Sequence, residues 1–466
     1  MSFFIKNKQS RRGAKNKFSN KKEHKGKSKR PKLETRDDEI TSSEDEQDPE
    51  EPVENHVKDL SSEDENETAQ EKKLRLAKIY LEEIEKEELA RLEDKEFDSE
   101  QVNGALISER LKIDYLKQTG RLKASVAHEY IGADTDNLKI LKAKEHKSAI
   151  TCICVSSNGN YLFSGSKNGS IVKWSLLEYK KVGSIPYKKK SDSKEVLGHS
   201  KEILSIALSA DDNFLAVGDG TNIIQVWDPT NLKHKGSLTG HRDSVTGLTF
   251  RRGTHTLYSC SKDRSIKVWT LDEMSYVETL YGHQDKITSI DSLSKERAIT
   301  SGGRDTSIRI WKIVEESQLI YNGHSGSIDI VRLINEEHFV SGGDDGYLCV
   351  WSVSKKKPLC MVKEAHGCDT TNSQPNWITS VASLVNTDLI ASGSHDGFIR
   401  IWKLESNFRK ISLLFSIEIE GFVNDLVFTL DGKYLLAGIG REHRFGRWTV
   451  INSAKDTVVI IPLIKK

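Results

Sequence analysis

Several features that mark enzymes, membrane proteins and secreted proteins are missing from this chain of 466 residues. Its 6 cysteines form no Cys-x-x-Cys pair, which favours core thiols of a reduced intracellular protein over a metal or redox site. No apolar run approaches the ~18 residues of a membrane span, and the N-terminus lacks a secretory pattern. Phosphate-binding glycine loops, His-Glu-x-x-His and Gly-x-Ser-x-Gly are also absent. We therefore expect no enzyme activity, metal, cofactor, membrane contact or small-molecule substrate.

Net charge of either sign is nearly absent overall, since 70 Lys/Arg and 69 Asp/Glu leave a formal net charge of +1, but two N-terminal blocks are strongly charged. Residues 1–36 hold 14 Lys/Arg against 2 Asp/Glu, and residues 37–67 hold 15 Asp/Glu against 1 Lys. Such blocks bury too little apolar surface to fold, so a disordered tail is predicted over 1–67. Part of the basic block is spaced like a bipartite nuclear import signal, and a merely solubilising or RNA-adhesive tail is the alternative. The import residues would be Lys21, Lys22, Lys29, Arg30 and Lys32.

A short helical connector is predicted after the tail, over residues 68–131. The segment Thr68–Glu71 has the form of a capping box. One apolar stripe then runs from Leu74 to Ile84 on a heavily charged helix, and a second helix is expected near 105–128. The narrow stripes favour short coiled-coil pairing, or docking on the flank of the main domain, over an independent domain.

Tryptophan recurs along the last two-thirds of the chain, each time after a short apolar strand pattern, at spacings of 40 to 53 residues. A Gly-His pair precedes most of these tryptophans. A Gly-His to Trp unit with this period is the signature of a four-stranded propeller blade. We therefore predict an all-β fold, a seven-bladed WD-repeat β-propeller over residues 136–466. The blade tryptophans would be Trp174, Trp227, Trp269, Trp311, Trp351, Trp402 and Trp448.

Each regular blade is predicted to contain a structural network of four polar side chains. In blade three these are the loop His241, the strand Ser259, the turn Asp263 and the indole of Trp269, which satisfy one another's hydrogen bonds. The first three resemble a hydrolase triad, but their recurrence in later blades indicates a structural role. The matching residues of blades four and five are His283, Ser301, Asp305 and Trp311, and His324, Ser341, Asp345 and Trp351.

Blades two and seven depart from this pattern. Blade two has Thr221 where the turn Asp is expected, and blade seven has neither Gly-His nor the Asp. Structural drift at the seam of the ring and a functional role are both compatible with the cation-rich turn at 440–448. The outer strand of blade seven is expected from either 138–141 or 457–461.

Cations are unevenly distributed among the blade turns. Blades one, three, four and seven carry Lys or Arg there, whereas blades five and six carry Asp344 and His395. Since turns and Gly-His loops emerge on one rim, we expect two basic arcs that bind phosphates, with a merely solvated rim as the alternative. The turns show no evident stacking aromatics, which favours backbone recognition of a folded RNA. The candidate RNA-binding residues are Lys167, Lys262, Arg264, Arg304, Arg441, His443, Arg444 and Arg447.

Motifs more specific than the Gly-His and Trp of the generic repeat resemble one family, the WD-repeat proteins of the U3 small nucleolar ribonucleoprotein. They include the runs 67–78, 240–245, 276–285 and 440–448, and the resemblance extends from about residue 67 to the end. It implies a nucleolar, non-catalytic component of the small-subunit processome. Such a protein would bind the box B/C region of U3 small nucleolar RNA together with the kink-turn-binding protein and other U3-particle proteins. It would be required for pre-rRNA processing to 18S rRNA.

A different class of function fits the same repeats when the resemblance is set aside. A WD-repeat protein-only scaffold or substrate adaptor in the nucleus would use the same rigid platform to grip a peptide. The sequence favours the RNA-binding component because of the uneven charge of the blade turns.

Overall fold

The computed structural model describes residues 69–93, 104–188, 198–369 and 373–466, so the predicted tail and import signal lie outside the described residues. The chain forms two compact units, 1–79 and 80–466. The division into a tail, a connector and a propeller at the predicted boundaries stays a prediction. Among the described residues, no helix is both long enough and apolar enough to cross a membrane.

The predicted helices are α1 (Ala69–Glu93) and α2 (Gly104–Gln118), but the second is shorter than expected. Helix α2 ends because Gly120 adopts a left-handed conformation with φ +71°, and the Arg121 amide donates a 2.8 Å hydrogen bond back to the Leu116 carbonyl. The expectation of a helix reaching residue 128 was therefore wrong. The chain continues instead as an extended segment, interrupted by the short 3-10 helix Ala127–Glu129.

This extended segment docks on blades five and six. Its Ala124 amide donates to the Asn386 carbonyl at 2.8 Å. Asp388, which is 1% exposed, accepts hydrogen bonds of 2.8 Å from the amides of Val126 and Ala127. A buried carboxylate needs such donors, so Asp388 fixes the segment to the rim of blade six.

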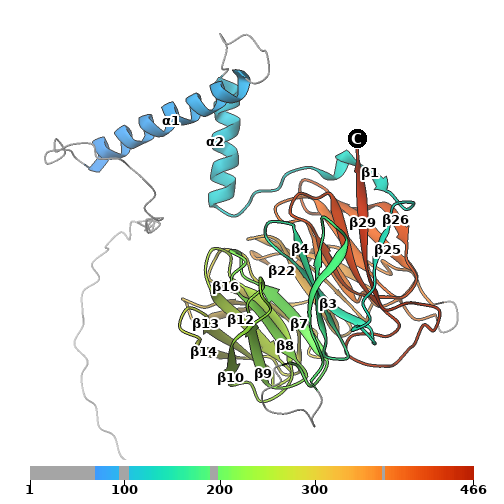
Figure 1. Cartoon of the computed structure of the whole chain (residues 1–466). Helices are drawn as coiled ribbons and strands as arrows, with labels where there is room; N and C mark the ends of the chain where they lie inside the picture. Colours follow the sequence, from blue (N-terminus) through green and yellow to red (C-terminus); the bar gives the residue numbers. More distant parts are fainter. Residues whose placement is uncertain (1–68, 94–103, 189–197, 370–372) are drawn as a thin grey trace, which may run out of the picture. The chain divides into compact units, whose positions relative to one another are not determined.

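Seven antiparallel sheets form the rest of the fold, and Figure 1 shows them side by side. The first two blades are β3 (Ile150–Val155), β4 (Tyr161–Ser166), β5 (Ile171–Ser175) and β6 (Lys180–Ile185), then β7 (Ile203–Leu208), β8 (Leu215–Asp219), β9 (Ile223–Trp227) and β10 (His234–Thr239). Blades three and four are β11 (Val245–Phe250), β12 (Thr256–Ser261), β13 (Ser265–Thr270) and β14 (Ser275–Tyr281), then β15 (Ile287–Asp291), β16 (Arg297–Gly302), β17 (Ser307–Lys312) and β18 (Ser317–Asn322). Blades five and six are β19 (Ile328–Asn335), β20 (His338–Gly343), β21 (Leu348–Ser352) and β22 (Lys355–Val362), then β23 (Ser380–Ser383), β24 (Leu389–Gly393), β25 (Phe398–Leu404) and β26 (Ile411–Glu418).

Blade seven closes the ring with strands from both ends of the domain. It consists of β27 (Phe422–Phe428), β28 (Tyr434–Gly440), β29 (Thr457–Lys465) and, outermost, β1 (Tyr130–Ala133) and β2 (Lys139–Leu141). The pairing of Leu141 with Val458 shows that the N-terminal stretch supplies the outer strand, while the C-terminal one lies next to β28. The innermost strands contact one another in order, and β27 contacts β3. A seven-bladed propeller is therefore confirmed.

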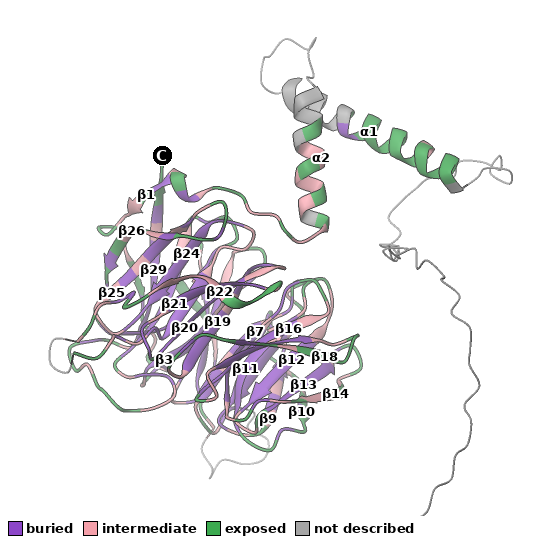
Figure 2. Cartoon of the chain, turned by 180° about the vertical axis from the view of Figure 1, so that it is seen from behind, coloured by how far each residue is buried: buried purple, intermediate pink, exposed green. Residues whose placement is uncertain are grey.

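The core lies between the faces of adjacent blades, where the buried strands are drawn in purple in Figure 2. In one such cluster, Phe163 of blade one packs with Ile203, Val217 and Trp227 of blade two. The alternation of apolar and polar residues along each strand allows both faces of a blade to pack on neighbours. Burial raises the pKa of the Cys260 thiol to about 12, which keeps this core cysteine neutral.

Trp448 was wrongly assigned to the repeat. The third strand of blade seven is β29, and Trp448 lies before it in the connection from β28, with a side chain that is 60% exposed. The six other repeat tryptophans lie in the third strands of blades one to six and are 0–5% exposed. The seventh blade is therefore built without the blade tryptophan.

Candidate nucleic-acid interface

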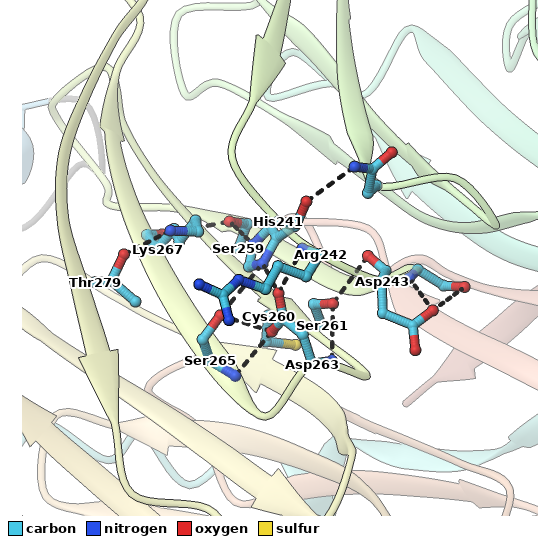
Figure 3. Close-up of polar contacts among 12 residues, drawn as sticks. His241, Arg242, Asp243, Ser259, Cys260, Ser261, Asp263, Ser265, Lys267 and Thr279 are labelled. Atoms are coloured by element: carbon cyan, nitrogen blue, oxygen red, sulfur yellow. Dashed lines mark hydrogen bonds and ion pairs between the residues drawn. The ribbon is translucent and has the colours of Figure 1, made fainter.

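The predicted polar network is present in blade three, and Figure 3 shows its His241, Ser259 and Asp263. The imidazole of His241 lies 3.0 Å from the Asp263 carboxylate and 2.8 Å from the Ser259 hydroxyl, which also accepts the Trp269 indole N–H at 2.8 Å. Burial opposes ionisation of Asp263, but hydrogen bonds from His241 and Ser265 outweigh it and hold its pKa below the ordinary value. Ser259 is completely buried, so no substrate can reach its hydroxyl.

The same network recurs around the ring, with one error in its prediction. In blade five, His324 lies 2.7 Å from the Ser341 hydroxyl, as expected. In blade four, however, the hydroxyl between His283 and Trp311 belongs to Thr300, at 2.8 Å from each, and not to Ser301. Blade four has one more residue between this hydroxyl and the turn Asp, so counting from the tryptophan selects the wrong side chain.

Blade two keeps only half of the network. Its His199 bonds to Asp219 at 3.1 Å, and Asp219 also accepts from Thr221, so the carboxylate sits two residues before the expected position. Val217 pairs with Gln225, as Ser259 pairs with Lys267 in blade three. Because valine has no hydroxyl, the Trp227 Nε1 and the His199 Nε2 are buried without a partner.

The blade turns and the loops between blades meet at one end of the propeller, which we call the turn face. In blade three the Lys262 amide donates to Ser244 of the preceding loop at 3.0 Å, and in blade four Gly303 donates to Lys286 at 2.8 Å. Each turn is thereby fixed against its loop, so its cations project from a rigid base. The predicted cations with exposed side chains are Arg264, Arg304, Arg441 and Arg447, and Lys262 is partly exposed.

Three of the predicted RNA-binding residues have structural partners instead. The Lys167 ammonium lies 2.9 Å from the Glu442 carboxylate and donates to the His443 carbonyl at 3.3 Å, which holds the blade-seven loop against blade one. His443 is only 1% exposed, and burial together with the nearby Arg444 lowers its pKa to about 3, so its ring is neutral.

Arg444 is also buried, because its side chain points into the axial channel. This residue is 5% exposed and donates to the Asp329 carbonyl of blade five at 2.8 Å. With Arg332 and Asp425 it lines a small hollow at the centre of the ring. Burial raises the pKa of Asp329 to about 6, and the Arg444 charge opposes that rise. The expectation that Arg444 and His443 project from the rim is therefore corrected, and we withdraw both as RNA contacts.

An aromatic cluster on the turn face was missed by sequence reasoning. The Trp448 ring lies with its centroid 5.7 Å from that of Trp377 and 5.3 Å from that of His443. Trp377 in turn contacts His395, which stacks on Phe422. Trp377 is the one tryptophan outside the repeat spacing, and this was the signal that could have identified the cluster.

A lysine-lined pocket lies beside this cluster, between blades one and two. Its walls include Lys147, Lys167 and Lys201 together with the exposed ring of Tyr187, and Glu145 and Glu202 offset part of the charge. Lys147 and Lys201 lie in loops between blades, outside the turn positions at which the RNA-binding cations were predicted. Lys167 belongs to the pocket and also contacts the blade-seven loop, so the pocket and the aromatic cluster are adjacent.

Comparison with known families identifies the repeats. The family described as WD domain, G-beta repeat matches residues 137–175, 191–228, 232–270, 274–312, 315–352 and 367–403. Blade seven is not among these matches, in keeping with its missing tryptophan and histidine.

Whole-chain relatives and solved structures are also similar. The U3 small nucleolar RNA-interacting protein 2 of Homo sapiens is 52% identical over 399 residues, which cover 85% of this chain and 82% of the relative. The Ribosomal RNA-processing protein 9 of Saccharomyces cerevisiae is 28% identical and aligns with 90% of this chain and 93% of its own. A crystal structure of RRP9 WD40 repeats superimposes with a TM-score of 0.69 at 47% identity, and covers 72% of this chain and 100% of its own. A structure of U3-55K gives 0.68 at 48% identity, with 71% and 100% covered.

Proposed function

The chain belongs to the family of WD-repeat U3 small nucleolar RNA-interacting proteins, and we propose that its turn face binds U3 small nucleolar RNA. In this proposal the protein is a non-catalytic component of the U3 particle that acts in ribosomal RNA processing, and it works in the nucleolus. The observation that carries the proposal is the one-sided charge of the turn face. Exposed Arg264 and Arg304 and the lysine-lined pocket lie on blades one to four, whereas blade five presents Asp344.

The finer assignment follows from the family. We propose that the RNA element is the box B/C region of U3, bound together with the kink-turn-binding protein, and that the particle is the small-subunit processome that matures 18S rRNA. A rigid ring suits this task, because its turns are fixed by backbone hydrogen bonds and offer phosphate contacts without a folding cost. The polar network supports a non-catalytic role, since its His, Ser and Asp side chains satisfy one another in the interior.

Charge reversal on the turn face tests the proposal. The variant changes Lys262, Arg264 and Arg304 to glutamate and leaves the buried Arg444 intact. Each lost phosphate contact lowers the slope of log affinity against log salt by roughly 0.7 to 0.9, so three contacts lower it by roughly two to three units. The measurement is binding of full-length protein to U3 RNA, with and without the kink-turn-binding protein, across a salt series.

A matched control carries the same change of charge away from the turn face. Lys355, Lys356 and Lys357 are exposed at the start of β22, the outer strand of blade five. Their reversal to glutamate should leave both the affinity and the slope close to the unmodified protein. Equal losses in the two variants would indicate a general charge effect, and no loss in the turn-face variant would contradict the proposed interface. In the latter case a protein-only scaffold would become the better account.

A further inference from the structure

The side chain of Trp448 is unusually exposed for its size and packs against other aromatic rings. It is 60% exposed, whereas the six blade tryptophans are at most 5% exposed. The ring centroid lies 5.7 Å from that of Trp377 and 5.3 Å from that of the buried His443. Gly446 lies so close that a Cβ there would meet the Trp448 ring at 2.7 Å. A single exposed aromatic residue is ordinary, but this one is the exposed end of a packed cluster.

Two cations lie near this ring and share one carboxylate, that of Glu442. Arg447 is adjacent, and its side chain is 76% exposed with one nitrogen 2.9 Å from Glu442. Lys167 reaches the same carboxylate from blade one and leads into the lysine-lined pocket. A fixed aromatic face beside cations is the combination that binds unpaired nucleotides, because bases stack on the ring while the phosphates follow the positive charge. An acidic peptide would be attracted by the same cations, but its charged side chains offer no aromatic ring to stack on the exposed indole.

We infer that Trp448 is a stacking platform for an unpaired base of the RNA. The inference rests on the proposed RNA-binding function and adds that the bound RNA presents at least one unstacked nucleotide to blade seven. It reverses the expectation that the turn face recognises only the backbone of a folded RNA, since that expectation assumed no stacking aromatic there. Trp377 and His443 would act as positioning residues that hold the ring without touching the base.

The first test uses the affinity of full-length protein for a short single-stranded RNA and for the blunt duplex formed with its complement. Stacking on one aromatic ring contributes roughly 1–3 kcal/mol, so Trp448→Ala should weaken single-strand binding by roughly 5- to 150-fold and leave duplex binding almost unchanged. Trp448→Phe should lose much less, because it keeps an aromatic face. The salt slope should stay the same in both, since an indole releases no counterions. Tyr115→Ala, which removes a 60% exposed aromatic side chain on α2, is the control.

The second test measures the fluorescence of Trp448. Trp448 is the dominant accessible fluorophore, because six of the 8 tryptophans are buried and Trp377 is half-buried. Single-stranded RNA should quench part of the emission and protect the remainder from acrylamide, and both effects should vanish in Trp448→Phe. Thermal melting of each variant checks that the fold is retained.

The outcomes separate the inference from the function on which it rests. If the charge-reversed turn face binds RNA less well while Trp448→Ala binds single strands normally, the stacking inference is overturned and the proposed function stands. If neither variant loses affinity, the proposed interface itself is wrong. Protection of Trp448 by a U3-particle protein but never by RNA would also overturn the inference, because the ring would then be a protein contact.

Discussion

Replacement of Arg444 by methionine probes a buried charge of the propeller. Methionine keeps much of the side-chain volume but removes the guanidinium that donates to the Asp329 carbonyl at 2.8 Å. The carboxyl groups of Asp329 and Asp425, both buried and close to Arg444, then lose a neutralising charge. Removing one partner from a buried charged group costs about 3–5 kcal/mol, so Arg444→Met should lower the free energy of unfolding by that amount near pH 8.

The loss should depend on pH, with a sign that follows from Asp329. Burial raises its pKa to about 6 in the folded protein, above the unfolded value. The contribution of Asp329 to the free energy of unfolding is therefore present at low pH and is lost as the pH rises through the folded pKa. Without Arg444, the pKa of Asp329 in the folded protein rises further. The nearby Asp344 also raises this pKa, and Lys286 lowers it. At pH values above the folded pKa, each further unit of increase in that pKa costs about 1.4 kcal/mol of stability. The variant should therefore be destabilised less at pH 5.5 than at pH 8.

Urea unfolding followed by tryptophan fluorescence at the two pH values measures both effects. Arg447→Met, three residues away with a 76% exposed side chain, should change stability by less than about 0.5 kcal/mol. Adding Asp329→Asn to Arg444→Met should recover part of the loss. A loss below about 1 kcal/mol at pH 8, or one independent of pH, would refute the structural role assigned to Arg444.

Three further predictions follow from the network, the buried histidine and the tail. Val217→Thr should stabilise the protein by about 1 kcal/mol in urea unfolding, because a hydroxyl there can accept the unpartnered Trp227 indole N–H, as Thr300 accepts that of Trp311. Thr300→Val should cost about 1–3 kcal/mol, and equal effects of the two changes would contradict this reasoning. His443 has a folded pKa of about 3, so its contribution to stability is lost as pH falls below about 6.5, by about 2 kcal/mol at pH 5. His443→Asn should remove that part of the pH dependence of stability, and an unchanged pH dependence would contradict the buried neutral state of His443. Alanine at Lys21, Lys22, Lys29, Arg30 and Lys32 should reduce nuclear accumulation of newly made protein in imaging, and normal accumulation would argue against an import signal.

The propeller could be predicted because its blades repeat one local pattern. The His241, Ser259, Asp263 and Trp269 set is dictated by hydrogen-bond chemistry within a single blade, so spacing along the chain was enough to find it. The same counting failed at Thr300, because blade four has one extra residue before the turn Asp. It also failed at Trp448, because β29 and not the segment ending at Trp448 forms the third strand of blade seven. In blade seven, β29 replaced the expected strand because it pairs with β28 and with the N-terminal β2 at the same time.

The candidate site was harder to predict, because exposure depends on contacts between blades. Arg441, Arg444 and Arg447 look equivalent in sequence, yet Arg444 enters the axial channel to reach Asp329, more than a hundred residues away along the chain. The cluster of Trp377 and Trp448 likewise joins blade six to blade seven. Neither arrangement has a local periodicity, so only the three-dimensional structure distinguishes the buried cation from the exposed ones.

Crosslinking in cells tests the central claim most directly. Ultraviolet crosslinking of the full-length protein, with sequencing of the bound RNA and mass spectrometry of the crosslinked peptides, identifies both sides of the contact. The account predicts U3 RNA attached to peptides of the turn face, above all those that contain residues 261–265, 302–306 and 440–448. Crosslinks confined to other surfaces of the propeller, or a bound RNA other than U3, would contradict it.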